Sequence, residues 1–308
     1  MTSPRSAVAA ALIGALALGG CGSNDDAIAS DGVVRQTITV GRTTEPISQL
    51  LAEIYGQGLE NSGFGVGRKD PVADRAATLA ALADDRVQFV PELSAALLAH
   101  VTSAAGTVNA ALTVDEQLAA LKLELPTLAA GPATSAAATT VVACSQAIVA
   151  EHSLSNVSSL AAVAGQVAVG GSATFESAEP FGLAALNRAY DTDFDYTVIA
   201  DAGFSDQVST QLADGSIGCV IASQMLAAIT IDGLIVLADD KTALPADMII
   251  PLMTIAAAGP DVQAVITQIN TSITTDALRA LLVKVSLGGD SYAVIAGQFL
   301  TSLSQGEQ

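Results

Sequence analysis

The chain has 308 residues, of which 51% are hydrophobic and 14% are charged. Its formal net charge is −19, with 12 Lys and Arg against 31 Asp and Glu; this balance excludes binding to a nucleic-acid backbone, which takes clusters of basic side chains. The length exceeds what a single core usually holds and predicts two domains or lobes.

Residues 1–20 are predicted to be a lipoprotein signal peptide. Arg5 supplies a positive start, and the apolar run 7–18 is too short to span a bilayer core of about 30 Å. The Leu-Gly-Gly-Cys sequence that ends at Cys21 matches the pattern at which such signals are cut and the cysteine is acylated. We expect Cys21 to carry a lipid, residues 21–35 to form a tether, and the mature chain to be exported and anchored to the outer face of the cytoplasmic membrane. The alternative is an Ala-rich helix that happens to end in cysteine.

Strands and helices alternate along the rest of the chain. In the first part, period-2 and helical patterns predict strands at 37–41, 65–67 and 87–90, the last ended by Pro91, and helices over 47–59 and 70–83. In the second part they predict strands at 166–169, 196–199, 216–222 and 234–237, helices over 181–190 and 207–213, and closing helices that carry Leu278 and Tyr292. This order is typical of an α/β fold with parallel strands and crossover helices.

Two further cysteines lie in strand-like runs. With Cys21 acylated, Cys144 and Cys219 form an even pair in an oxidising compartment. A disulfide between them would close a loop of about 75 residues and contribute up to about 4 kcal/mol by chain entropy. The alternative is two buried free thiols that pack as small hydrophobes.

Several segments, taken in order, resemble the OpuAC/ProX-type substrate-binding proteins of glycine betaine and osmoprotectant importers. Residues 39–60 are similar to that family's first strand and helix, and Val-Pro-Glu-Leu at 90–93 to its strand that ends in Tyr-Pro-Glu-Tyr. Residues 237–247 look like its Leu-Glu-Asp-Asp-Lys and Phe-Pro-Pro-Tyr stretch, and residues 273–278 match its closing helices in pattern. The resemblance spans about residues 36–300.

The resemblance implies a two-lobed type II periplasmic-binding-protein fold, with mixed sheets flanked by helices and two hinge crossings. Residues 36–140 would form the first part of lobe 1, residues 141–224 lobe 2, and residues 225–308 the second part of lobe 1 with the C-terminal helices. A ligand would lie in the cleft, where open α/β sheets bind ligands beyond the carboxyl ends of their strands. An ABC permease and ATPase complex would be the partner.

The sequence departs from the family at its ligand cage. A quaternary ammonium is held by several aromatic faces, yet the chain has no Trp and only four Tyr, each of which we interpret as scaffold. Leu93, Thr140 and Asp247 occupy positions where the family has aromatic residues, and the family's basic residue falls at Thr43. By the resemblance, the candidate ligand-binding residues are Arg42, Thr43, Leu93, Thr140 and Asp247, and Thr44 joins them by its place in a strand-to-helix turn.

Two of these assignments have structural alternatives. Thr43 and Thr44 either donate hydrogen bonds to a ligand or cap the helix that follows. Asp247 either faces the cleft, where a carboxylate favours a cationic or polyhydroxylated ligand, or is a solvated loop residue.

No catalytic centre, metal site or cofactor is expected. The two histidines, His100 and His152, have no second ligand at metal-binding spacing, and no Gly-x-Ser-x-Gly elbow occurs. The sequence therefore predicts an extracytoplasmic solute-binding lipoprotein of an ABC importer that captures a small polar or cationic solute between two lobes. The alternative is a degenerate binding-protein fold that serves as a non-transporting surface interaction module.

Overall fold

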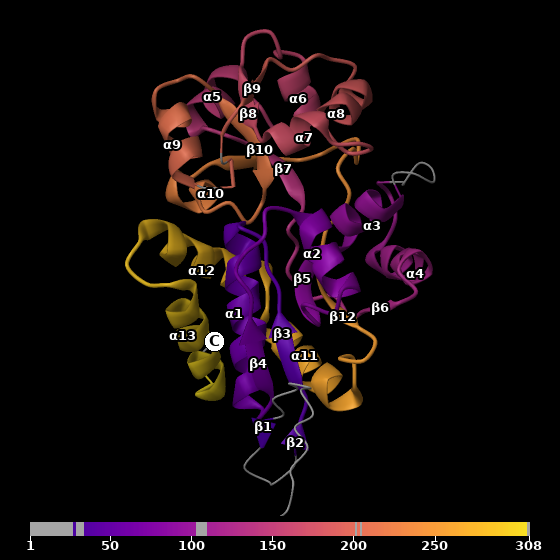
Figure 1. The fold of residues 1–308 in the computed structure, drawn as a ribbon. Helices are drawn as coiled ribbons and strands as arrows, with labels where there is room; N and C mark the ends of the chain where they lie inside the picture. Colours follow the sequence, from indigo (N-terminus) through magenta and orange to yellow (C-terminus); the bar gives the residue numbers. More distant parts are fainter. Residues whose placement is uncertain (1–26, 29–33, 103–109, 201, 204, 307–308) are drawn as a thin grey trace, which may run out of the picture.

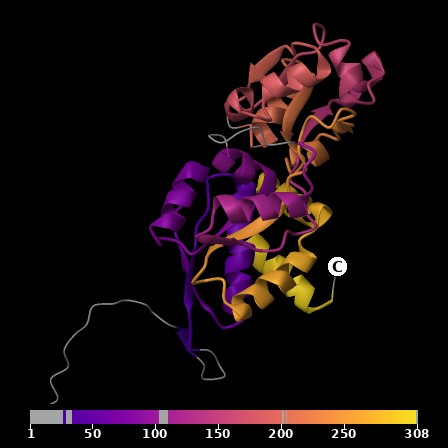
Figure 2. The ribbon, with the colours of Figure 1, turned by 90° about the vertical axis from the view of Figure 1, so that its right-hand side faces the viewer.

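Two α/β lobes, each built on a five-stranded mixed sheet, make up the chain in its computed structural model (Figure 1). The structure describes residues 27–28, 34–102, 110–200, 202–203 and 205–306. In a view turned by 90°, one lobe lies above the other, and a few extended segments connect them (Figure 2). The expected two-lobed α/β fold is confirmed.

Lobe 1 has the strand order β4-β3-β5-β12-β6. Strand β3 is parallel to β4 and β5, whereas β12 is antiparallel to β5 and β6, so the sheet is mixed. The strands are β3 Thr37–Val40, β4 Gly65–Arg68, β5 Phe89–Leu93, β6 Leu128–Ala130 and β12 Ile249–Thr254. The helices are α1 Pro46–Asn61, α2 Arg75–Ala83, α3 Ser94–Thr102, α4 Val114–Glu124, α11 Pro260–Ser272, α12 Thr275–Leu287 and α13 Tyr292–Ser304.

Helix α1 forms the centre of lobe 1. Its residues from Leu50 to Leu59 are almost all buried, because both the sheet and the C-terminal helices pack against it. The ring of Tyr55 lies 5.0 Å from that of Phe89 on β5. The Tyr55 hydroxyl donates a 2.6 Å hydrogen bond to Oδ1 of Asn270 on α11. This residue is therefore scaffold, as its helical spacing predicted.

Strand β5 continues through Pro91 to Leu93, whereas the proline was predicted to end the strand. Pro91 pairs with Pro251 of β12, and on the other side β5 meets β3 only at Phe89. Proline lacks an N–H group and interrupts a sheet only where a neighbouring strand needs that donor. Because β3 has ended at Val40, Pro91 leaves no ladder hydrogen bond unmade on that side.

Lobe 2 has the strand order β11-β7-β10-β8-β9. Strands β8, β9 and β10 are parallel, and β7 runs antiparallel to β10 and β11. The strands are β7 Thr140–Cys144, β8 Val169–Gly171, β9 Tyr196–Val198, β10 Cys219–Ser223 and β11 Ile235–Leu237. The helices are α5 Gln146–His152, α6 Val157–Ala161, α7 Ala173–Ser177, α8 Leu183–Tyr190, α9 Ser205–Ala213 and α10 Ala228–Ile231.

The boundary predicted at residue 224 is wrong. Strand β11 pairs with β7 as the edge strand of the second sheet. Leu226 and Ile229 pack in one lobe 2 core, and Leu244 packs in the other. The chain therefore returns to lobe 1 between Leu244 and Ile249, and residues 225–244 belong mainly to lobe 2. The sequence pattern predicted the strand at 234–237 but held no information on its partner.

Cys144 and Cys219 form a disulfide inside lobe 2. They stand directly opposite each other on the antiparallel strands β7 and β10, with a Cα–Cα distance of 3.9 Å. Both residues are fully buried. The bond links two chain segments that are 75 residues apart.

The N-terminal predictions fall largely outside the described residues, Cys21 and residues 1–20 included. Within the expected tether, β1 (Ala27–Ile28) and β2 (Val34–Arg35) form a short antiparallel ribbon. Among the residues described, no helix is both long enough and apolar enough to span a membrane.

Candidate functional site

The carboxyl ends of parallel strands from both lobes lie beside the crossings. In lobe 2, Ser223 at the end of β10 pairs with Thr140, which begins β7 directly after the first crossing. In lobe 1, Leu93 at the end of β5 pairs with Ile249, which begins β12 directly after the second crossing. Open α/β sheets bind ligands beyond such strand ends, so the space between the lobes is where a ligand site is expected.

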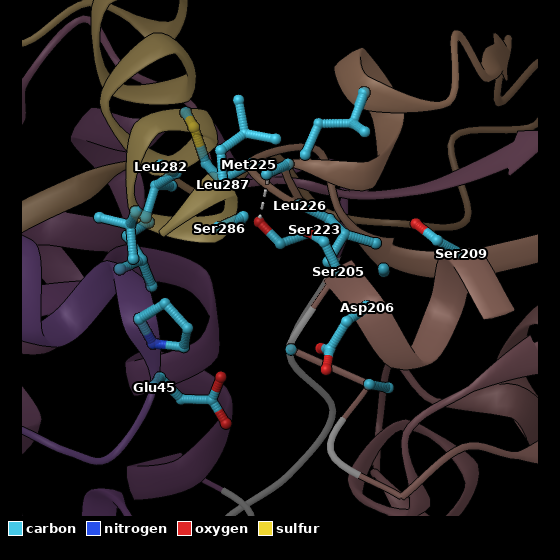
Figure 3. Close-up of a pocket in the computed structure, with 18 of the residues that line it drawn as sticks. Glu45, Ser205, Asp206, Ser209, Ser223, Met225, Leu226, Leu282, Ser286 and Leu287 are labelled. Atoms are coloured by element: carbon cyan, nitrogen blue, oxygen red, sulfur yellow. Dashed lines mark hydrogen bonds between the residues drawn. The ribbon is translucent and has the colours of Figure 1, made fainter. Parts of the chain in front are cut away.

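A cavity of about 500 Å³ lies between the two lobes (Figure 3). This volume falls within the range of about 300–1,000 Å³ that is usual for small-molecule sites. Lobe 1 contributes the start of α1, the end of α12 and Tyr292. Lobe 2 contributes the start of α9 and the segment that follows β10.

Two carboxylates from opposite lobes face this cavity. Glu45 is the N-cap residue of α1, but its side chain makes no capping hydrogen bond to that helix. Instead it reaches lobe 2, since a Cβ atom added to Gly203 would collide with Oε2 of Glu45. Asp206 lies in the first turn of α9. Figure 3 shows the two carboxylates directed toward each other across the gap. Among the described lining residues none is Lys, Arg or His.

Serine hydroxyls hold the lobe 2 wall in place. Ser205 Oγ accepts a 2.9 Å hydrogen bond from the backbone N–H of Ala228, which ties the start of α9 to α10. Ser223 Oγ donates to the carbonyl oxygen of Ala138 in the first crossing at 3.1 Å and accepts from the N–H of Met225. The wall is therefore attached to the hinge. The remainder of the lining is largely aliphatic and includes Ile47, Leu226, Ile231, Leu282, Val285 and Leu287.

Tyr292 lines the cavity, which corrects its interpretation as scaffold alone. It also packs against the lobe 1 core. Its partial burial, and after that the negative charge of Glu45, raise the pKa of its hydroxyl. Tyr190 and Tyr196 belong to the packing of lobe 2, as expected.

Arg42 points along α1 and is not among the lining residues. Its Nη1 lies 2.8 Å from Oε1 of Glu53, whose other oxygen is 3.1 Å from Nε of Arg68. Arg68 also pairs with Glu60 at 2.6 Å. These charges form a continuous network along the side of α1, so Arg42 has a structural partner.

Thr43 and Thr44 organise the entry to α1. The N–H of Thr43 donates to Ser48 Oγ at 2.9 Å, and the Oγ1 of Thr43 accepts from the N–H of Glu45 at 3.4 Å. Thr44 binds the backbone of Val72 through its N–H. Both threonines lie beside the cavity without lining it, and they position Glu45, which does.

Leu93 and Thr140 are also absent from the cavity wall. Leu93 packs against the lobe 1 core. Thr140 stands opposite the lining residue Ser223 in the register of β7 and β10. Roles in ligand binding for both residues stay predictions.

Asp247 is buried, with 8% of its surface exposed, so the solvated-loop alternative is wrong. Its Oδ1 accepts hydrogen bonds from the N–H groups of Ala95 at 2.8 Å and Ala96 at 3.4 Å, in the first turn of α3. Its own backbone binds Thr139 Oγ1 and the N–H of Ala138 in the first crossing. Burial raises the pKa of this carboxyl to about 6, against the lowering effect of the backbone donors. Asp247 thus joins α3 to both crossings.

The lining carboxylates Glu45 and Asp206 are absent from the sequence-based site. One available signal was their position, because each follows a predicted strand at 37–41 or 196–199. Binding residues concentrate in the loops beyond such strand ends. Tyr292 carried no comparable signal. Within the described part of the chain, no group of three or more His, Cys, Asp or Glu side chains is placed to hold a metal ion.

Several solved structures share this fold at low sequence identity. The crystal structure of a glycine betaine/carnitine/choline ABC transporter protein has a TM-score of 0.73 at 15% identity, covering 86% of this chain and 98% of that one. Apo YehZ from Escherichia coli has a TM-score of 0.68 at 16% identity, covering 88% and 99%. Lactococcal OpuAC, closed and complexed with glycine betaine, has a TM-score of 0.61 at 12% identity, covering 87% and 96%. Comparison with curated proteins finds no match.

A family model described as the substrate binding domain of the ABC-type glycine betaine transport system matches residues 36–302. The match covers both lobes and both crossings. It supports an extracytoplasmic, substrate-binding role in an ABC importer, not an enzymatic one, and gives no support to the alternative of a non-transporting surface module. The chain belongs to the family of substrate-binding domains of ABC-type glycine betaine transport systems.

Proposed function

We propose that the chain captures a small cationic solute in the cavity between its lobes and presents it to an ABC permease. The observation that carries this proposal is the pair Glu45 and Asp206, which face one cavity from opposite lobes. None of the described lining residues is Lys, Arg or His, so the two acidic side chains are the charged groups among them. A cleft lined by one sign of charge concentrates ligands of the opposite sign.

The placement of the two carboxylates also explains how a cation would favour closure. Like charges from two lobes repel each other as the lobes approach, and a cation between them replaces repulsion with two attractions. A ligand shifts an open–closed equilibrium only by its differential affinity for the two states. Contacts from both lobes, present together only in the closed state, supply that difference.

A thermal-shift assay on the purified full-length chain tests capture of a solute. The panel comprises choline, glycine betaine, carnitine, polyamines and aliphatic amines, with neutral sugars for comparison. A cation at 100 times its dissociation constant should stabilise the chain by about 2.7 kcal/mol.

Two variants test the location of the site. Glu45→Gln and Asp206→Asn should each weaken binding of the stabilising cation about tenfold, through loss of one charge. Glu151→Gln, which removes an exposed carboxylate on α5 outside the cavity, serves as the matched control and should leave affinity unchanged. The proposal is wrong if no cation stabilises the chain, or if both cavity variants bind as tightly as the parent.

We further propose that a lipid on Cys21 holds the protein at the outer face of the cytoplasmic membrane. The support is the Leu-Gly-Gly-Cys sequence after a short apolar run, together with a family whose members act outside the cytoplasm. Cys21→Ser should abolish labelling by a radioactive fatty acid and release the chain from the membrane fraction. Persistence of the variant in that fraction would exclude lipidation of Cys21 as the sole anchor.

A further inference from the structure

We infer that Arg279 and Gln224 are positioning residues for solute capture, because they complete a non-covalent connection between the lobes that restricts how the lobes move. This connection, the interlobe link, consists of Ala137 in the first crossing, Gln224 after β10, and Thr275 and Arg279 on α12. It adds to the two covalent crossings. Its effect on affinity rests on the proposed function, whereas the link itself follows from contacts at the hinge.

Ala137 is held by both lobes. Its N–H group donates a 3.1 Å hydrogen bond to Oγ1 of Thr275, the first residue of α12 in lobe 1. Its carbonyl oxygen accepts a 2.6 Å hydrogen bond from Nε2 of Gln224, which directly follows β10 of lobe 2. One residue of the first crossing therefore connects a lobe 1 helix to the end of a lobe 2 strand.

Arg279 connects the same two elements directly. Its Nε donates a 3.2 Å hydrogen bond to the carbonyl oxygen of Gln224. Arg279 follows Thr275 by one turn of α12, so both side chains lie on the same face of the helix. The Arg279 side chain is only 25% exposed, and a hydrogen bond from a charged donor is stronger than one between neutral groups. Its other printed partner, Asp276, is 95% exposed, and such surface ion pairs contribute little.

Apolar packing anchors the segment after β10 in both lobes. Met225 is 3% exposed and packs in the lobe 1 core that also contains Leu278 and Leu282 of α12. The next residue, Leu226, packs in a core of lobe 2. In addition, α10 of lobe 2 lies against α12. The hydrogen bonds of the interlobe link are therefore supported by buried side chains on both sides.

The interlobe link lies at the hinge itself. The N–H of Gln224 donates to the carbonyl oxygen of Thr139, and Ser223 Oγ donates to that of Ala138. Thr139 and Ala138 belong to the first crossing, about which the lobes turn. Atoms close to a hinge axis move little during closure, so the link is compatible with rotation of the lobes. It opposes sliding and twisting of one lobe against the other.

The elements joined by the link also form the cavity. The last turns of α12 line it from lobe 1, with Leu282 and Leu287 among the lining residues, and Ser223 and Leu226 line it from lobe 2. The link therefore fixes the two walls relative to each other at the hinge end of the cavity. The apparent affinity of a ligand is proportional to the fraction of the free protein that is competent to bind it. A restricted interlobe motion raises that fraction.

Two substitutions of Arg279 separate the hydrogen bond from the other properties of the side chain. Arg279→Gln places an N–H group at the same number of bonds from Cα as Nε of arginine, so it keeps a donor for Gln224. Arg279→Met places a methyl carbon there and loses the donor. Both variants lose the charge and the contact with Asp276 equally. Arg188→Met, at an exposed position on α8, is the control for loss of a cation elsewhere.

Interlobe distances test the link without any solute. Spin labels carried by unnatural amino acids at Leu123 on α4 and Glu151 on α5, both exposed, report on the two lobes by double electron–electron resonance in the full-length chain. The parent, Arg279→Gln and Arg188→Met should give a narrow distance distribution. In Arg279→Met it should be roughly twice as wide, because additional arrangements of the lobes become populated. Gln224→Met, which loses the bond to Ala137, should show the same widening.

Titration calorimetry with choline tests the consequence for capture. Arg279→Met should bind choline about threefold more weakly than Arg279→Gln, because a smaller share of the free protein is competent. Equal distance distributions in these two variants would overturn the inference, whether or not choline binds. Equal choline affinities despite a wider distribution in Arg279→Met would overturn the positioning role. If no cation binds the parent, the proposed function fails, and the distance comparison still decides whether the link restricts the lobes.

Discussion

Replacement of Asp247 by Asn tests how much the burial of this carboxylate at the hinge destabilises the folded chain. The carboxylate is buried between α3 and the two crossings, where it accepts the N–H groups of Ala95 and Ala96. Two charged groups face it: Arg75 on α2 lowers its pKa, and Glu92 on β5 raises it. Desolvation is the largest influence, and the pKa rises from 3.8 to about 6. An asparagine amide keeps an acceptor oxygen for α3 without having to hold a buried charge.

The magnitude follows from the pKa. At 1.36 kcal/mol per pKa unit, a rise from 3.8 to about 6 corresponds to about 3 kcal/mol. Because the folded-state pKa is raised, this group favours folding fully below the unfolded-state value and loses that contribution as the pH rises through about 6. The free energy of unfolding of Asp247→Asn minus that of the parent should therefore grow by up to about 3 kcal/mol between about pH 4 and about pH 8.

Urea unfolding followed by circular dichroism at several pH values measures this difference. Asp70→Asn, at an exposed position, is the matched control and should show no such growth. A difference that stays constant with pH would refute the reasoning. A difference of the opposite sign would show that the dipole of α3 and the charge of Arg75 together outweigh desolvation.

Three further predictions concern stability. The double change Cys144→Ala and Cys219→Ala should lower the free energy of unfolding by about 2–5 kcal/mol, measured by urea titration without reductant; an unchanged midpoint would show that the disulfide adds nothing to the fold. Tyr55→Phe leaves the buried Oδ1 of Asn270 without its donor and should cost about 1–3 kcal/mol in the same titration, whereas a neutral result would mean that water replaces the hydroxyl. Gly58→Ala places a Cβ against α11 and should cost about 1–3 kcal/mol; a gain in thermal stability, as helix propensity alone predicts, would contradict the packing shown.

The spacing of apolar residues predicted many of the helices and strands, because these elements depend mainly on residues close together in the sequence. The strand at 37–41 and the helix over 47–59 were found within a residue or two as β3 and α1. Strand β12 was missed although Ile249 to Thr254 is a mostly apolar run. A proline such as Pro251 is unfavourable in a central strand because it has no N–H group to donate. It fits here because it stands opposite Pro91 on one side, while on the other side β6 pairs with β12 only from Leu252 onward.

The site was less predictable than the fold for a related reason. Asp247 was identified as a residue of interest, but its partners in α3 lie about 150 residues away in the sequence. Arg42 is similarly engaged by Glu53 on the next helix, a pairing that the spacing alone does not reveal. The residues that line the cavity come from both lobes. Local sequence patterns do not show which loops of the two lobes lie next to each other in the folded chain.

The insertion of lobe 2 as one continuous stretch within lobe 1 sets an order of assembly. During N-to-C synthesis, all five strands of the second sheet emerge before Ile249 does. Until β12 arrives, β5 and β6 have no strand between them, and the apolar face of α1 lacks α11 and α13. Lobe 2 therefore can reach its final form while lobe 1 still exposes an open sheet edge. The last sixty or so residues therefore complete lobe 1. If translation stalled or a protease cut before them, the product would contain a folded lobe 2 and an incomplete lobe 1 with an exposed sheet edge, which favours aggregation.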